Sequence, residues 1–326
     1  MRTSFFSPSK ITRKKDESDI SSQITKKNRP FWTVTTPNIE AINNIKKNRD
    51  LPLQLALEEY NTIIHQGSVY SNSTKILEKT YPQITKQNLI GYYNSIFNPQ
   101  NLVISINGNI DKDYTIKELN TIFKQKNNGT FDYNNVFVPT IQKQRISTQI
   151  SPNTKTAWIF LGWQTDGVQN LKEYATLQVI DSLLGSGMSS RLFKNLRDQE
   201  GLAYQIGSSF SPNIKKGHFV VYIGTNLKNL DYSKSKLFNE INKLKTEYVG
   251  TKELQEAKDK LLGQFVISQE TNLEKASSVG WFETSGRGYK FKNTYPELIN
   301  EVTENDIIEV ANKYFNDNYA LSIVKN

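Results

Sequence analysis

The chain has 326 residues, with 41 Lys and Arg against 32 Asp and Glu, so its net charge is +9. This length is typical of about two domains, and the 37% of apolar residues suffices for a buried core. The absence of cysteine excludes disulfides, thiolate nucleophiles and cysteine-based metal sites. No apolar run reaches the roughly 18 residues of a transmembrane helix, so the sequence predicts no membrane span.

The only histidines are His65 and His218, which lie 153 positions apart (218 − 65 = 153). They cannot form a His-x-x-x-His pair on one helix, and we expect no multi-histidine metal site in this chain. His65 follows an apolar helical pattern, where a histidine typically complements the helix dipole or bonds to a carbonyl group. We interpret His218, at the start of a predicted strand, as structural.

Residues 1–36 hold eight basic and three acidic residues, and we interpret them as a flexible leader. They lack the apolar segment of a secretory signal, and the compartment stays open. Further along, lysines alternate with Glu and Asp, which is typical of solvated helix faces. Because no nucleic-acid-binding motif accompanies the positive charge, we expect no nucleic-acid partner.

An internal repeat is the most informative feature of the sequence. Residues 84–108 align without a gap to residues 302–326 at an offset of 218, with identical positions that include Thr85/Thr303 and Phe97/Phe315. Both copies predict an N-capping Thr, an amphipathic helix and a buried strand. The second copy has a full repeat length before it, whereas the first has about half, so the sequence predicts one and a half repeats.

Residues 127–155 are polar and rich in turn formers, and we interpret them as an interdomain linker. Beyond it the pattern predicts a strand over 156–164, helices over 173–184 and 189–199, and paired strands over 202–211 and 218–224. Several amphipathic helices follow. Strands followed by a helical layer indicate an α+β fold, with a mixed sheet covered by helices on one face.

The segment Leu183-Leu184-Gly185-Ser186-Gly187-Met188-Ser189-Ser190-Arg191-Leu192-Phe193, with Leu196-Arg197 and Gly201-Leu202-Ala203-Tyr204, resembles the second-domain signature of the insulinase-like M16 zinc peptidases. This family includes the mitochondrial processing peptidases, and the resemblance extends from about Ile39 to the C-terminus. It implies two homologous α/β sandwich domains that close around an extended peptide. The expected division is 1–36 leader, 37–126 the C-terminal half of the first domain, 127–155 linker, and 156–326 the second domain.

The resemblance also implies two substrate-binding residues. In the family an Arg and a Tyr, seven positions apart, hold the substrate backbone, and Arg197 and Tyr204 match them (204 − 197 = 7). A guanidinium and a phenol are hydrogen-bond donors that can orient the carbonyl groups of a bound strand. On residue types and spacing alone, a solvated arginine and a half-buried strand aromatic would explain both positions.

The family's zinc site is not matched. No His-x-x-Glu-His motif occurs, so we assign no catalytic residue, metal ligand or cofactor to this chain, although the family binds zinc. The register of Asp50-Leu51-Pro52 places Asn44 at the family's glutamate-ligand position, and Glu40 one turn earlier is the alternative. A neutral amide is a poor replacement for a carboxylate on zinc.

Three functional hypotheses follow. The first is an M16-like protein that binds extended peptide through its second domain, is not catalytic by itself, and forms a hetero- or homo-oligomer with a subunit that carries the His-x-x-Glu-His motif. The second is an active zinc metalloendopeptidase whose N-terminal part is missing from this sequence. The third is a structural or interaction protein without a peptide substrate.

Overall fold

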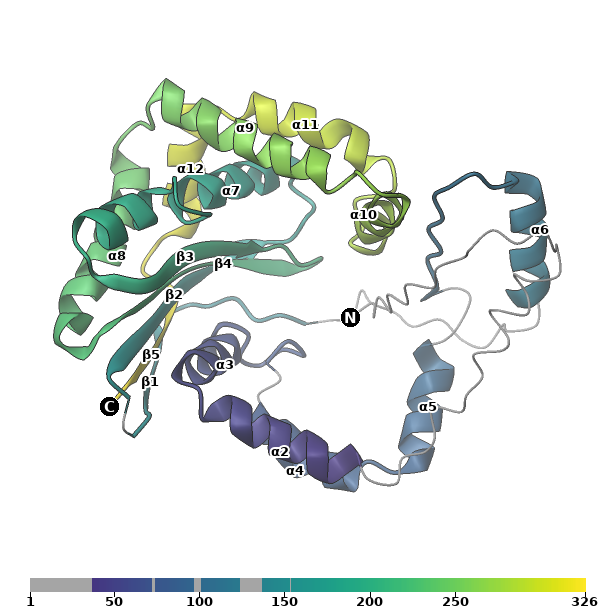
Figure 1. Ribbon diagram of the computed structural model, residues 1–326, viewed down its shortest axis with the longest axis horizontal. Coiled ribbons are helices and arrows are strands. Elements are labelled where there is room, and N and C mark those ends of the chain that lie inside the picture. Colours follow the sequence, from purple (N-terminus) through teal and green to yellow (C-terminus); the bar gives the residue numbers. More distant parts are fainter. Residues whose placement is uncertain (1–36, 72–73, 97–100, 124–136, 153) are drawn as a thin grey trace.

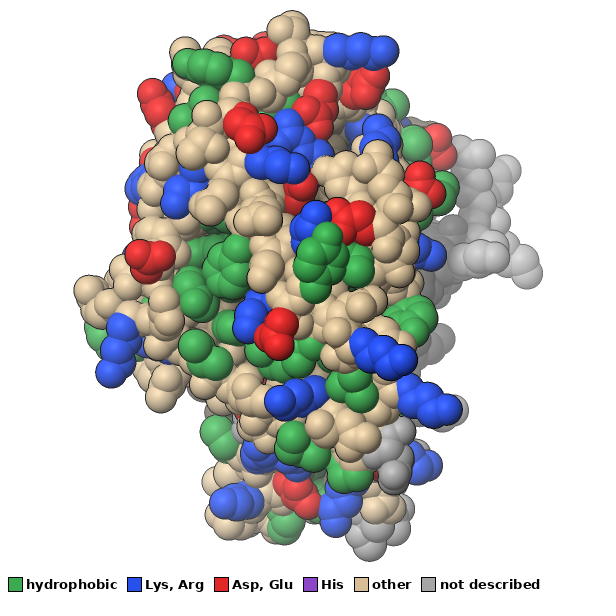
Figure 2. Space-filling model, turned by 90° about the vertical axis from the view of Figure 1, so that its left-hand side faces the viewer, with side chains coloured by type: hydrophobic (Ala, Val, Ile, Leu, Met, Phe, Trp, Pro, Cys, Tyr) green, Lys and Arg blue, Asp and Glu red, His purple; other side chains and the backbone are tan. Residues whose placement is uncertain are grey.

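The computed structural model describes residues 37–71, 74–96, 101–123, 137–152 and 154–326 (Figure 1). The expected leader, residues 1–36, lies outside these ranges. None of the helices in the described part of the chain combines the length and apolar character needed to cross a bilayer. On the face shown in Figure 2, Lys and Arg are interspersed with Asp, Glu and apolar side chains.

A five-stranded sheet in the order β1-β5-β2-β4-β3 forms the centre of the molecule (Figure 1). Strand β1 runs parallel to β5, and the other neighbouring strands are antiparallel. The sheet is therefore mixed, as predicted, and the predicted pair of strands over 202–211 and 218–224 is confirmed. The strands are β1 (Arg145–Ile150), β2 (Thr156–Asp166), β3 (Ala203–Ser211), β4 (Lys216–Asn226) and β5 (Tyr319–Lys325).

The predicted helical layer covers one face of this sheet (Figure 1). Ile159, Ile223 and Ile323, which are cross-strand neighbours on three adjacent strands, contribute to a large apolar core shared with these helices. Burial of this core is the main stabilising term of the fold. The helices are α7 (Leu171–Leu184), α8 (Leu230–Thr246), which follows the short η5 (Leu227–Asn229), α9 (Thr251–Ile267), α10 (Asn272–Thr284), α11 (Phe291–Glu301) and α12 (Glu304–Tyr314).

The opposite face of the sheet is covered by α3 (Pro52–Ile64), the helix predicted before His65, whose placement on this sheet the sequence did not predict. Ala56, Tyr60 and Ile64 are fully buried in a second apolar cluster with side chains of β2, β4 and β5. The hydroxyl of Ser322 on β5 donates to the carbonyl group of Ala56 at 3.0 Å. Because helices cover both faces, β2 reads as an almost continuous buried run.

The repeat extends beyond the segment in which the sequence shows it. Helix α5 (Lys86–Ile96) matches α12 at an offset of 218 (304 − 86 = 314 − 96 = 218). At this offset α2 (Pro37–Arg49) falls on 255–267 in α9, α3 on 270–282 over most of α10, and α4 (Thr74–Thr80) on 292–298 in α11. A short η1 (Tyr81–Gln83) precedes α5, and α6 (Lys112–Phe123) follows the repeated part. The helix order therefore supports the predicted duplication.

The strand predicted for the first copy is absent. Residues 101–107 correspond to β5 (319 − 218 = 101), yet they have no strand pairing within the described ranges. Leu102, Ile104 and Ile106 are 45%, 44% and 46% exposed, whereas Ala320 and Val324 of β5 are fully buried. A strand needs a neighbour to satisfy its backbone groups, and the described residues of the first repeat include none.

Part of the expected linker belongs to the sheet. Residues 145–150 lie within the 127–155 stretch, and as β1 they pair in register with β5. Residues 127–136 and 153 of that stretch lie outside the described ranges. The division into a leader, two domains and a linker stays a prediction.

Candidate substrate-binding site

The glycine-rich segment Gly185–Gly187 follows α7 and turns the chain across β3. A Cβ atom at Gly185 would lie 2.1 Å from the backbone nitrogen of Ser208, so only glycine permits this close approach. Gly187 has φ +78, in the left-handed region that favours glycine. The hydroxyl of Ser190 donates to the carbonyl oxygen of Gly187 at 2.7 Å and closes the turn.

A partly buried polar cluster supports this segment on the side of β3. The hydroxyl of Ser208 on β3 donates to Oδ1 of Asp181 at 2.5 Å, and the ammonium group of Lys260 donates to the carbonyl oxygen of Ser186. Burial raises the pKa of the Asp181 carboxyl group, against the opposing effects of Ser208, the Phe210 backbone and Lys260. The cluster therefore holds the end of α7 against β3.

The helix predicted over 189–199 is confirmed in position, but residues Phe193–Gln199 form a π-helix. Such irregular turns occur frequently at functional sites. The guanidinium of Arg191, just before it, forms two hydrogen bonds of 2.7 Å with the carboxylate of Glu253 on α9. This bidentate pair anchors the start of the segment that carries Arg197.

Arg197 lies exposed on the π-helix, with its guanidinium 4.8 Å from the centre of the Phe193 ring. Among the ion pairs and hydrogen bonds of the described residues, none uses its guanidinium. The five N–H donors of this group are therefore available to a ligand.

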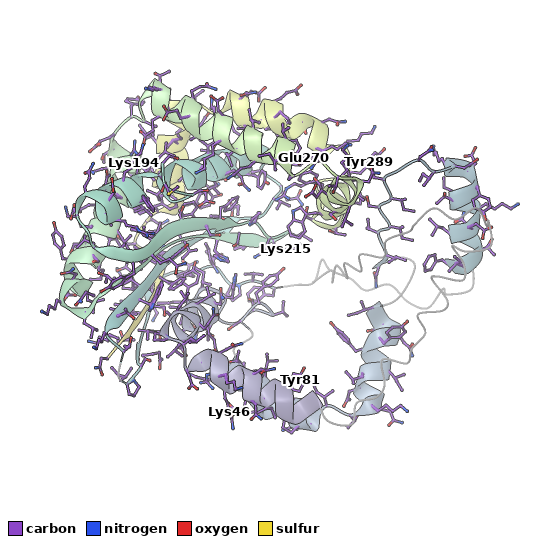
Figure 3. All side chains as sticks on the ribbon, viewed as in Figure 1. Lys46, Tyr81, Lys194, Lys215, Glu270 and Tyr289 are labelled. Carbon is purple, nitrogen blue, oxygen red and sulfur yellow. The ribbon has the colours of Figure 1, made fainter. Side chains whose placement is uncertain are left out.

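Tyr204 lies at the start of β3 and is 60% exposed. The β3–β4 register shifts between Ala203 and Gln205, so Tyr204 occupies a bulge, a device that re-aims a side chain. The backbone N–H of Leu202 donates to the carbonyl group of Leu196 at 2.8 Å and connects the π-helix to the strand. In Figure 3 the label of Lys194 marks the π-helix, and the label of Lys215 marks the turn between β3 and β4.

The structure therefore brings the two predicted substrate-binding residues to one end of the sheet, because the π-helix packs against β3. Within the described ranges β3 pairs only with β4, so no strand lies on its other edge, where the Phe210 backbone bonds to Asp181. An extended peptide can add to such an edge through main-chain hydrogen bonds. A guanidinium and a phenol beside it can orient the peptide's carbonyl groups.

The supporting residues Asp181, Ser208, Glu253 and Lys260 were not found from the sequence. They come from three elements, α7, β3 and α9, and no sequence motif connects these elements. Gly185 and Gly187 were the available signal, because glycine marks a close backbone approach.

The described residues do not fit the family's zinc site. Asn44 lies exposed on α2, while the side chain of Glu40 lies outside the described part of the structure. Both histidines lie elsewhere, one at the end of α3 and the other on β4. No group of three or more His, Cys, Asp and Glu side chains in the described ranges is arranged to hold a metal.

His65 and His218 meet in the interior, although 153 positions separate them. Both are buried, and their ring centres are 5.0 Å apart. Burial lowers the pKa of His65 to about 4; burial and the neighbouring His65 lower that of His218 to about 3. Both rings are therefore neutral at pH 7.

His65 lies at the C-cap position of α3, and other side chains bind the last carbonyl groups of the helix. Arg145 donates to Ile63 at 2.9 Å, and Gln164 donates to Ile64 at 3.0 Å. The hydroxyl of Ser71 donates to Thr62 at 3.0 Å.

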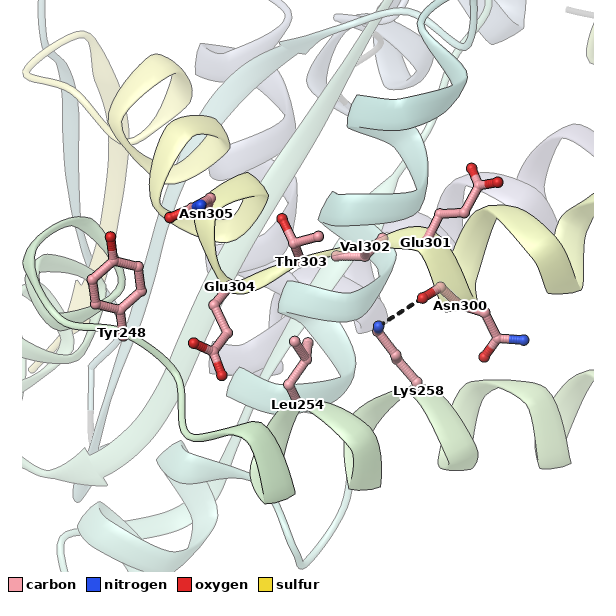
Figure 4. A pocket seen from close by; sticks show the side chains of 9 residues that line it. All are labelled: Tyr248, Leu254, Lys258, Asn300, Glu301, Val302, Thr303, Glu304 and Asn305. Atoms are coloured by element: carbon pink, nitrogen blue, oxygen red, sulfur yellow. Dashed lines mark hydrogen bonds between the residues drawn. The ribbon is translucent and has the colours of Figure 1, made fainter.

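A surface pocket lies where α9 and α12 begin and α11 ends (Figure 4). The ammonium group of Lys258 donates to the carbonyl group of Asn300 at 2.9 Å, and the hydroxyl of Thr251 donates to Glu304 at 3.0 Å. These polar groups therefore already have partners within the chain. The pocket lining includes neither Arg197 nor Tyr204.

Comparison with known proteins agrees with this fold. Residues 83–261 match the family model described as "Peptidase M16 inactive domain", so the chain belongs to the M16 peptidase family. An uncharacterized zinc protease of Rickettsia felis is 27% identical over 274 residues, covering 84% of this chain and 65% of the relative. A protein of Helicobacter pylori named a non-peptidase homolog is 25% identical, covering 74% of this chain and 54% of the relative.

A crystal structure titled as a peptidase M16 inactive domain from Pseudomonas fluorescens has the same fold, with a TM-score of 0.79 at 18% identity. The match covers 88% of this chain and 69% of that one. The sequence matches span about half to two thirds of the length of the two curated relatives, whose names include both a zinc protease and a non-peptidase homolog. Zinc therefore belongs to the family, while the described residues of this chain contain no group of three or more side chains that could hold a metal ion.

Proposed function

We propose that this chain binds extended polypeptide along the free edge of β3, with Arg197 and Tyr204 orienting the peptide backbone. The observation that carries the proposal is the position of Tyr204, which lies exposed in a bulge where the π-helix meets the edge strand. Arg197, with its guanidinium unpaired among the described residues, lies on the segment packed beside it. The described residues supply no zinc site, so we propose that the chain is not catalytic by itself.

A fluorescein-labelled unstructured peptide tests this proposal by anisotropy titration. We expect Arg197→Ala and Tyr204→Phe each to weaken binding by about 1–3 kcal/mol, roughly 5- to 150-fold in Kd, because each removes oriented hydrogen-bond donors. Tyr248→Phe is the matched control, since Tyr248 is 66% exposed and lies between α8 and α9. Unchanged binding in both site variants would favour the third hypothesis, a protein without a peptide substrate.

We further propose that the first repeat packs against an M16 subunit that carries the His-x-x-Glu-His motif. Helix α3 of the first repeat covers the sheet of the second, and its counterpart α10 lies beside residues 101–108 of the first. A Cβ at Gly280 of α10 would lie 3.4 Å from that of Ser105. Yet apolar side chains on both of these segments remain exposed. Leu273 and Trp281 of α10 are 55% and 53% exposed, and Leu102, Ile104 and Ile106 are 45%, 44% and 46% exposed.

This face has the character of an interface. Exposed apolar side chains beside an unpaired extended segment favour association with further strands. At the offset of 218, no residue of the described ranges corresponds to β1–β4. A partner with an M16-type sheet would supply such strands and a zinc site together.

Native mass spectrometry of the protein from its own source distinguishes the hypotheses. A 37.4 kDa chain in complex with a second M16 chain would support the proposed non-catalytic subunit. A heavier chain would instead support the N-terminally incomplete metalloendopeptidase. A 37.4 kDa monomer would contradict both.

A further inference from the structure

The interior between α3 and β4 contains a group of polar atoms without hydrogen-bond partners. The Nδ1 atoms of His65 and His218 and the hydroxyl of Tyr60 are buried and unpaired. No hydrogen bond within the described ranges uses any ring nitrogen of the two histidines. Buried polar groups are nearly always paired, so unpaired atoms gathered in one place indicate a missing water or ion.

The spacing of the two rings suits a shared metal ion. A zinc–nitrogen bond is about 2.0–2.1 Å, so two imidazoles at a tetrahedral angle on one ion have centres about 5 Å apart. The centres of His65 and His218 are 5.0 Å apart, with the ring planes at 77°. Imidazole is a preferred ligand of Zn²⁺, Ni²⁺ and Cu²⁺.

The surroundings leave the two imidazoles free for this role. Tyr60 lies 5.7 Å from His218, and Tyr70 lies 5.5 Å from His65, measured between ring centres. Gln164, opposite His218 in the sheet, uses its amide on the backbone of Ile64, Pro139 and Ile141. The nearby carboxylate of Glu59 bonds to Lys75, Ser147 and Gln149 instead.

We propose that His65 and His218 form a two-histidine binding site for a divalent transition-metal ion of the Zn²⁺ and Ni²⁺ class. The ion would cross-link α3 of the first repeat to β4 of the second, and water would complete its coordination. The inference does not depend on the proposed peptide binding, because the two sites share no residue.

The low histidine count allows a direct test on the unmodified protein. A long-range ¹H–¹⁵N spectrum of the tag-free chain contains ring signals from only two histidines, so Zn²⁺ can be titrated without mutation. We expect ring nitrogens of both residues to shift together and to saturate at one Zn²⁺ per chain. Shifts of one histidine alone, or none at a tenfold excess, would overturn the site.

Substitutions give an independent readout by calorimetric titration with Zn²⁺ and with Ni²⁺. We expect His65→Gln and His218→Gln each to weaken binding at least tenfold, since each removes one of two protein ligands. Tyr70→Phe is the control, because it retains the ring beside His65 and should bind as the wild type does. Equal affinity in all four proteins would contradict the proposal. If the histidine variants fail to fold, the wild-type spectrum still decides the question.

Discussion

The rings of His65 and His218 lie 5.0 Å apart at the contact between the two repeats. His65 caps the helix that the first repeat places on the sheet, and His218 lies on the strand beneath it. Their contact shows that α3 is an integral part of the second repeat's core, despite its position in the first.

The phenol of Tyr60 gives the first prediction. Its hydroxyl is fully buried and has no hydrogen-bond partner. It packs closely against Gly162, where an added Cβ atom would lie 2.2 Å from the hydroxyl oxygen. Tyr60→Phe removes an unpaired polar atom and keeps the ring, so we expect the free energy of unfolding to rise by up to about 1 kcal/mol. Urea unfolding measures the change, and a loss above about 1 kcal/mol would show that the hydroxyl has a bound partner.

The turn after α7 gives the second prediction. Gly185→Ala would place a Cβ 2.1 Å from the Ser208 backbone, so we expect a loss of about 3 kcal/mol in stability. Gly263→Ala is the matched control, since this helical glycine has open space around it and should gain up to about 1 kcal/mol. Thermal unfolding of both variants checks the contrast, and a similar effect of the two substitutions would contradict the close approach.

The ion pair between Arg191 and Glu253 gives the third prediction. Its two hydrogen bonds of 2.7 Å are partly shielded from solvent, so Arg191→Ala should lower stability by about 1–2 kcal/mol. The pair Lys252–Glu256 is the comparison, because its charged atoms are 3.9 Å apart and its side chains are 92% and 60% exposed. Lys252→Ala should cost less than about 0.5 kcal/mol. A double-mutant cycle for each pair measures the two coupling energies, and equal values would refute the distinction.

The carboxyl group of Asp181 gives a pH dependence. Its pKa is raised in the folded state, so its contribution to stability is fully present below the unfolded pKa of about 3.9 and is lost as the pH rises through the folded pKa. The stability of the wild type relative to Asp181→Asn should therefore fall as the pH rises above the unfolded pKa. Urea unfolding at several pH values measures this difference, and a flat profile would refute the effect of burial.

The sequence by itself determined the repeat and the mixed sheet, and its resemblance to the M16 family supplied Arg197 and Tyr204 as candidates. The repeat and the sheet depend on local order: helical periodicity in α5 and α12, and apolar β-forming residues in β3 and β4. Such patterns are read along the chain and need no knowledge of distant contacts.

The tertiary structure alone decided which segments cover one another. The placement of α3 on the second repeat's sheet depends on apolar surface that many helices share, so periodicity did not predict its partner. The pairing of His65 with His218 follows from that docking, and the 153 positions between them gave no sign of it. Residues 101–107 show the reverse: they have the sequence of a buried strand, but a strand forms only where a neighbour satisfies its backbone.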